Sequence, residues 1–99
     1  MFGKINELKK QMEESKQRLD SIFVEHQSPG GEVHLTMAAN YAIKDIHLSV
    51  ETQEMDREEL EDVLVLAMNK AFGKAKNANE SEMKNVAGGL VPGLNLPGL

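Results

Sequence analysis

The sequence predicts an α+β fold in which a helix, a three-stranded antiparallel meander and a long second helix (α-β-β-β-α) follow one another. Three observations support this prediction. Apolar residues recur with a heptad spacing over residues 5–22, polarity alternates over residues 32–37, and an apolar stripe with helical spacing begins at residue 60. Because the strands are sequential and joined by short turns, we expect an antiparallel sheet with one apolar face.

Apolar residues of the first segment recur at alternating spacings of three and four residues, which predicts a helix that ends near Ser21. The recurring positions are Ile5, Leu8, Met12, Ser15, Leu19 and Ile22. This stripe permits two interpretations: it packs on the protein's own sheet, or part of it faces another chain. It is narrow, which is the shape that a helix-to-helix contact uses.

The next segment predicts two strands joined by a turn. "SIFVEH" (residues 21–26) is rich in β-branched and aromatic residues and indicates the first strand. "SPGG" (residues 28–31) is typical of a turn, because proline fixes φ and glycine accepts positive φ. The second strand alternates, with Val33, Leu35 and Met37 on the inward face.

A weaker turn signal at residues 38–41, where Asn40 is the best turn former, precedes the third strand. There we expect Ile46 and Leu48 to point inward, while Asp45 and His47 point outward. Ile43 is out of phase with this pattern, so it either lies near the turn or marks a β-bulge.

The last helix has the clearest start signal, because Asp56 is a good N-cap and Glu59 follows it at capping-box spacing. The apolar stripe then narrows from leucine and valine to alanine, and we expect the helix to end near Ala87. The stripe consists of Leu60, Val63, Leu64, Ala67, Ala71, Ala75 and Ala78. Alanine lets another backbone approach closely, or the helix extends beyond the core with little to bury.

The chain is expected to form one domain, residues 1–87, followed by an apolar tail, residues 88–99, that glycine and proline interrupt. The tail is either disordered or laid over a groove. Two helices of about 20 and 30 residues span roughly 30 and 45 Å, more than three short strands can cover. We therefore predict a homodimer. The candidate interface residues are Ile5, Leu8, Met12, Leu19, Ala67 and Ala71.

Composition restricts the class of function. The chain has no cysteine, which excludes a disulfide framework and a thiol nucleophile and fits a reducing cytoplasm. No signal peptide is visible, and the longest dense apolar run, residues 63–68, falls far short of the roughly 20 residues of a membrane span. We expect a cytoplasmic protein without membrane contact.

Charge is distributed unevenly along the chain, whose net charge is −5. Residues 51–69 have a net charge of −6 and residues 21–50 of −2, whereas residues 1–20 and 70–99 have +1 and +2. The overall acidity argues against nucleic acid, because phosphate binding depends on lysine and arginine. The two basic end segments nevertheless leave local basic faces possible.

The sequence offers little catalytic chemistry. His34 and His47 are directly opposed if Val33 pairs with Leu48, but two histidines make half of a zinc site at best. The seven carboxylates of residues 51–62 lack the spacing of a calcium loop and favour a helix N-terminus instead. No nucleophile or phosphate-loop motif occurs. We expect no enzyme activity, no metal and no cofactor.

Taken together, these segments resemble the YbaB/EbfC nucleoid-associated proteins over nearly the whole chain. The resemblance rests on the "MFGK" start, "GGEVHLTM", "AIKDIHLSVE", "MDREELEDVLVLAMNKAFGKAK" and "EMKNVAGGLVPGLNLPGL". The acidic cap that leads into residues 60–71 and the Gly-Gly…Pro-Gly ending are its most specific parts. The chain departs from the family at residues 38–41, "AANY", where Asn-Gly is often found.

The resemblance implies a cytoplasmic bacterial homodimer, tweezer-like, whose helices project from a shared β core. It also implies binding to double-stranded DNA and a role in nucleoid organisation or gene regulation. DNA contacts would then come from basic residues of the two helices. The candidates are Lys4, Lys9, Lys10, Lys16, Arg18, Lys70, Lys74, Lys76 and Lys84. The alternative is a non-enzymatic protein-interaction dimer that binds a partner protein through the acidic segment 51–62 and the tail.

Overall fold

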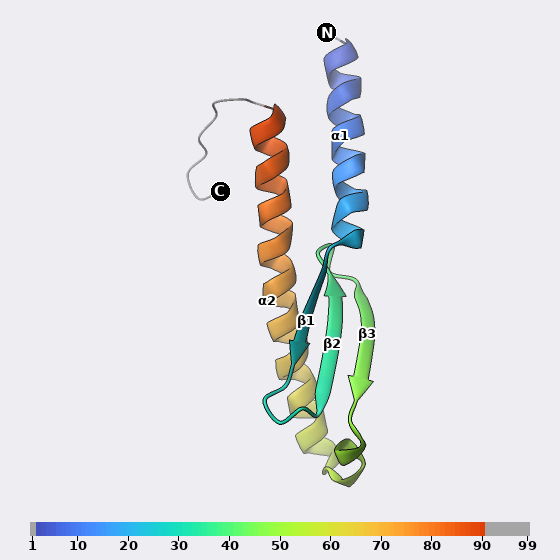
Figure 1. The fold of residues 1–99 in the computed structure, drawn as a ribbon, viewed down its shortest axis with the longest axis vertical. Coiled ribbons are helices and arrows are strands. Elements are labelled where there is room, and N and C mark those ends of the chain that lie inside the picture. Colours follow the sequence, from blue (N-terminus) through green and yellow to red (C-terminus); the bar gives the residue numbers. More distant parts are fainter. Residues whose placement is uncertain (1, 91–99) are drawn as a thin grey trace.

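The structure is a computed structural model that describes residues 2–90, and it confirms the predicted order of elements (Figure 1). Helix α1 (Phe2–Ser21) is followed by strands β1 (Phe23–Gln27), β2 (Val33–Ala38) and β3 (Ile43–Leu48). A short 3₁₀ helix, η1 (Val50–Glu54), which the sequence did not predict, leads into α2 (Arg57–Leu90). The molecule is elongated, with extents of 62 × 25 × 16 Å.

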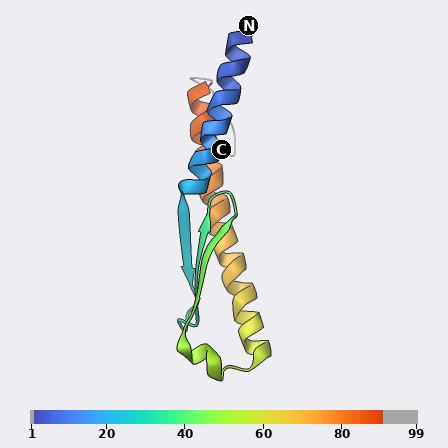
Figure 2. The same ribbon diagram turned by 90° about the vertical axis from the view of Figure 1, so that its right-hand side faces the viewer.

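The two helices differ in their relation to the sheet. The first half of α2 packs on β1 and β2, whereas α1 lies beyond the end of the sheet, next to the second half of α2 (Figures 1 and 2). Helix α2 continues to Leu90, past the expected end near Ala87. Most of the predicted tail, residues 91–99, lies outside the described residues, so the proposed domain boundary stays a prediction.

The sheet is antiparallel, in the order β1-β2-β3, and its register agrees with the sequence pattern. Val33 lies opposite Leu48, so the condition for opposed histidines is met and His34 lies opposite His47. The register shifts between Thr36 and Met37, which brings Ile43 opposite Met37. The out-of-phase Ile43 is therefore explained by an irregularity in the ladder, one of its two predicted causes.

The core lies between β2 and the alanine face of α2. Leu35 and Met37 form a buried cluster with Ala71 and Ala75, and Val24 of β1 packs against it. The methyl side chains allow the backbone of α2 to lie close to the sheet. The alanine stripe thus belongs to the chain's own core: Ala67 and Ala71, predicted at a dimer interface, are 1 % and 0 % exposed within one chain.

Strand β3 has the predicted orientation but is not covered. Ile46 pairs with Leu35 and Leu48 pairs with Val33, so both side chains belong to the face of the sheet on which α2 lies. The predicted inward direction is therefore confirmed, but the two side chains are 43 % and 42 % exposed. They are not buried within one chain because α2 lies over β1 and β2 and leaves β3 uncovered.

The loop between β2 and β3 contains the one non-glycine residue with positive φ in the described chain, Tyr41, at 71°. Asn40, the predicted turn former, accepts a hydrogen bond from the Ala42 N–H through its side-chain oxygen (3.1 Å). The left-handed conformation costs about 1–2 kcal/mol for a residue with a Cβ. The Tyr41 ring stacks on Phe72 of α2, with 4.7 Å between ring centroids, and this contact offsets part of that cost.

The start of α2 follows the predicted capping signal. The carbonyl oxygen of Asp56 accepts a hydrogen bond from the Leu60 N–H (3.0 Å), as an N-cap residue does. Glu58 and Glu59 lie in the first turn, where the helix dipole favours negative charge. The acidic segment thus stabilises the start of the helix.

Ser15 generates a stability prediction. It is 1 % exposed where α1 meets α2, and its hydroxyl oxygen has no hydrogen-bond partner among the described residues. A buried, unpaired polar group costs about 1–3 kcal/mol. We expect Ser15→Ala to raise the free energy of unfolding by about 1–2 kcal/mol in urea titrations at a fixed protein concentration.

The matched control is Ser81→Ala on the exposed surface of α2. It measures the gain in helix propensity alone, which is at most about 0.5 kcal/mol. An equal gain in both variants would show that the Ser15 hydroxyl carries no burial penalty.

Candidate nucleic-acid interface

The fold converts the uneven charge of the sequence into a separation along the long axis. Helix η1 and the first turns of α2, which hold the acidic segment, lie at one end of the molecule (Figure 1). Helix α1 and the second half of α2 lie side by side at the other end (Figures 1 and 2). We call these two helical segments, residues 2–21 and 74–90, the arms; each has more basic than acidic residues.

The five basic candidates of α1 are all exposed, but they are not equally free. Lys16 forms an ion pair with Glu13 one turn away (3.4 Å), and Arg18 forms an ion pair with Glu82 of α2. Lys4, Lys9 and Lys10 have no carboxylate within 4 Å among the described residues, so their charges remain open to solvent. These three lysines lie in the amino-terminal half of α1.

The four lysines of α2 are also exposed. Lys74 donates a hydrogen bond to the main-chain oxygen of Glu25 in β1 (2.8 Å), which holds its ammonium group against the sheet. The other three form no ion pair within the described part of the chain. The free candidates of the two helices are Lys4, Lys9, Lys10, Lys70, Lys76 and Lys84; all but Lys70, which lies where α2 packs on the sheet, are on the arms.

These lysines surround the two helices rather than form one stripe, because adjacent helical positions differ in direction by about 100°. Lys9 and Lys10 thus diverge from each other around the axis of α1. No row of arginine or aromatic side chains accompanies them in α1. Such an arrangement suits contact with phosphates, which carry no sequence information, better than contact with base edges.

His26 lies close to two of the candidates. It is on the α2-facing side of β1, in a pocket of about 180 Å³ that Leu66 and Lys70 also line. Desolvation by the surrounding residues lowers the pKa of His26, and the charges of Lys74 and Lys70 lower it further. The pocket is smaller than the roughly 300–1,000 Å³ of typical small-molecule sites.

The outward-facing histidines gather few ligands. His34 lies opposite His47, and its Nε2 is 3.9 Å from a carboxylate oxygen of Glu25. Among residues 2–90 no group of three or more potential metal-ligating side chains occurs. In the same part of the chain, no helix combines the length and apolarity needed to cross a bilayer.

Sequence reasoning placed the lysines on the two helices but missed the partner of Arg18. Glu82 lies at the next step of the stripe that contains Ala71, Ala75 and Ala78, at helical spacings of four, three and four residues. An acidic residue in line with a buried stripe is the signal that could have revealed it. Glu82, at the end of this stripe, is therefore part of the contact between α1 and α2.

Comparisons with known proteins agree on one family. The sequence model of the YbaB/EbfC DNA-binding family matches residues 1–90. A nucleoid-associated protein of Flavobacterium johnsoniae is 37 % identical over 99 residues, which cover 100 % of this chain and 91 % of that protein. One from Afipia carboxidovorans is 36 % identical over 98 residues, with 97 % and 93 % covered.

A solved structure has the same fold. The crystal structure of an uncharacterized protein from Helicobacter pylori superimposes with a TM-score of 0.76 at 19 % identity, over 87 % of this chain and 91 % of that one.

The lowered pKa of His26 predicts a pH dependence. Between pH 7.5 and 5.5 the unfolded chain binds a proton at an ordinary histidine pKa of about 6.5, while the folded chain resists protonation. The contribution of His26 to the free energy of unfolding is therefore fully present above this pH range, and it is lost as the pH falls through the range. We expect a lower melting temperature at pH 5.5 than at pH 7.5, and a smaller decrease in His26→Gln.

His47→Gln is the control, because His47 is exposed on the outer face of the sheet. It should keep the full decrease of the parent protein. The same decrease in His26→Gln and His47→Gln would assign the pH dependence to other groups.

Proposed function

The chain belongs to the YbaB/EbfC DNA-binding family, and on this premise we propose that it is a homodimeric nucleoid-associated protein that binds double-stranded DNA mainly through phosphates. Its role would be nucleoid organisation or gene regulation in the cytoplasm. The observation that carries the proposal is the separation of charge along the 62 Å axis, with free lysines on the arms.

The acidic end need not prevent DNA binding by the arms. Lys84 lies 24 residues beyond Leu60 on the same helix, or roughly 36 Å at 1.5 Å per residue. The Debye length is about 8 Å at physiological ionic strength, so repulsion between the acidic end and phosphates at the arms is largely screened. Residual repulsion would orient the protein with its arms toward the duplex.

The uncovered face beside α2 supports the homodimer. Three residues of β3 lie on the face of the sheet against which α2 packs, and each is more than 40 % exposed: Ile43, Ile46 and Leu48. Val65, Met68 and Phe72 recur on one side of α2 at helical spacing and are 57 %, 37 % and 48 % exposed. The stacking of Tyr41 on Phe72 joins this side of the helix to the β2–β3 loop.

An exposed edge strand with apolar side chains is a ready site for association, and a symmetric dimer, the commonest homo-oligomer, would cover this one. We assign the centre of the interface to these residues. Ile5, Leu8 and Met12 of the first predicted set are 41–52 % exposed and remain proposed contributors at the arm. Leu19 is 4 % exposed and, like the buried alanines, contributes to the chain's own interior.

The dimer predicts a mass near twice the 11.0 kDa of the chain in size exclusion with light scattering at micromolar concentration. Ile46→Glu should shift this mass toward that of one chain, because the substitution buries a carboxylate in the interface. Val50→Glu is the control, since Val50 is 73 % exposed in η1, outside the proposed face. A parent protein of 11 kDa throughout this range would contradict the dimer.

Phosphate binding predicts a strong dependence on salt. If about four lysines of the dimer reach phosphates, log K should fall against log salt with a slope of roughly −3.6. Replacing both Lys9 and Lys10 with alanine should flatten this slope and weaken all duplex sequences alike. Fluorescence anisotropy with two unrelated duplexes between 50 and 200 mM salt provides the measurement.

Arg57→Gln is the control variant, because it removes a positive charge at the acidic end of the molecule. It should leave the slope unchanged. Equal affinity at low and high salt, or an unchanged slope after neutralisation of all six free lysines, would contradict phosphate binding. A partner protein that is recovered in a pull-down and lost when the acidic segment 51–62 is neutralised would then favour the protein-interaction alternative.

A further inference from the structure

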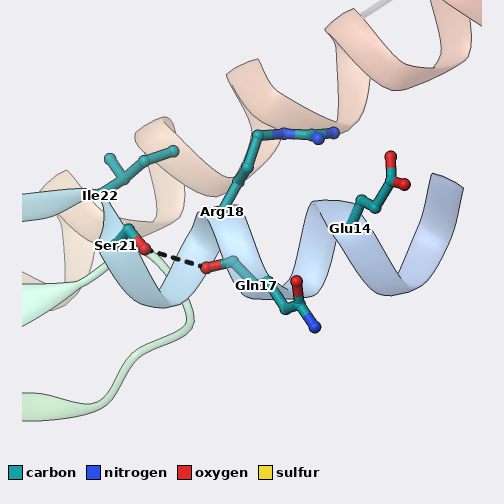
Figure 3. Close-up of a pocket in the computed structure, with 5 residues that line it drawn as sticks. All are labelled: Glu14, Gln17, Arg18, Ser21 and Ile22. Atoms are coloured by element: carbon teal, nitrogen blue, oxygen red, sulfur yellow. Dashed lines mark hydrogen bonds between the residues drawn. The ribbon is translucent and has the colours of Figure 1, made fainter.

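One ion pair joins the two arms of the chain. The Nε of Arg18 in α1 donates to a carboxylate oxygen of Glu82 in α2, 64 residues away. Figure 3 shows the Arg18 side chain extending from α1 toward the neighbouring helix. Of the ion pairs among residues 2–90, this one alone connects α1 with α2. The pair therefore acts at the contact that places the two arms side by side.

The environment of the pair is asymmetric. The Glu82 side chain is 13 % exposed, whereas that of Arg18 is 49 % exposed. Beside Arg18 on α1, Ser15 and Leu19 are buried. A carboxylate that is largely removed from water is unfavourable unless a cation and hydrogen-bond donors satisfy it. Glu82 thus needs Arg18, while Arg18 keeps half of its surface open to solvent.

We propose that Glu82 is a positioning residue that holds Arg18 in the contact between the arms and thereby withholds its charge from DNA. This inference rests on the proposed function, since it concerns the strength of the same phosphate binding. Arg18 then stabilises the arms and makes no phosphate contact in the parent protein. The carboxylate of Glu82 sets the affinity for DNA below the level that the basic residues of the arms would allow.

The geometry explains how one carboxylate limits binding. An arginine presents five N–H donors and remains charged at all relevant pH values, so a released guanidinium is a strong phosphate ligand. Glu82→Gln removes the negative charge but keeps the size of the side chain. The exposed surface of Arg18 would then be available to a phosphate that approaches the arms.

The test measures the salt dependence of duplex binding for a set of variants. Glu82→Gln should raise the affinity and steepen the slope of log K against log salt by up to about 0.9 for each Arg18, or about 1.8 in a dimer. Glu80→Gln is the matched control: it removes the same charge from an exposed position two residues away. It should change the slope much less.

Arg18→Gln separates release of arginine from a general charge effect. It should leave the slope of the parent protein unchanged, and it should abolish the extra slope in the Glu82→Gln background. A flatter slope for Arg18→Gln alone would show that Arg18 already contacts DNA. Equal slopes for Glu82→Gln and Glu80→Gln would also overturn the proposal.

Thermal unfolding of the same variants tests the ion pair in the absence of DNA. Arg18→Gln leaves a covered carboxylate without its cation, so it should lower the melting temperature more than Glu82→Gln or the double variant does. If the loss of melting temperature in the double variant equals the sum of the losses in the two single variants, the role of the pair is overturned. If the parent protein shows no salt-dependent DNA binding, the proposed function fails, and this thermal cycle alone decides the arm contact. Arg18→Lys provides a second test if Arg18→Gln does not fold.

Discussion

The packing of the alanine face of α2 on β1 and β2 is the contact on which the rest of the structure depends. Ala67, Ala71 and Ala75 are at most 1 % exposed, and their small side chains bring the helix close to Leu35 and Met37. A helix is about 10 Å wide, and neighbouring strands are about 4.8 Å apart, so one helix covers two strands. The third strand stays open for this geometric reason.

The same contact determines the shape of the molecule. Strands of six residues extend over roughly 20 Å, whereas the 34 residues of α2 extend over roughly 51 Å. The carboxyl-terminal part of the helix therefore projects past the sheet, where α1 lies beside it (Figure 1). These projecting helical segments are the two arms, and most of the candidate lysines lie on them.

This shape reconciles a net charge of −5 with membership of a DNA-binding family. Acidic residues stabilise the N-terminus of α2 at one end, and basic residues are collected at the other. Because the two ends are separated by several Debye lengths, the local charge of the arms would matter more than the total for the proposed DNA binding. Within the arms, Glu82 and Glu13 still neutralise part of that charge.

The sequence by itself determined the features that depend on local periodicity. It predicted the order of elements, the inward face of the second strand, the capping position of Asp56 and the helices that carry the candidate lysines. Each follows from spacings of two or three to four residues, which neighbouring side chains impose on the backbone. The single turn η1 escaped prediction because five residues are too few to show a period.

Only the tertiary structure decided which apolar faces are covered and which charges are paired. Ile46 and Leu48 follow the inward pattern, yet they are exposed because of the path of α2. The pairing of Arg18 with Glu82 joins residues 64 positions apart and depends on how far α2 projects beyond the sheet. Such contacts depend on the directions of whole helices, which no short spacing in the sequence encodes.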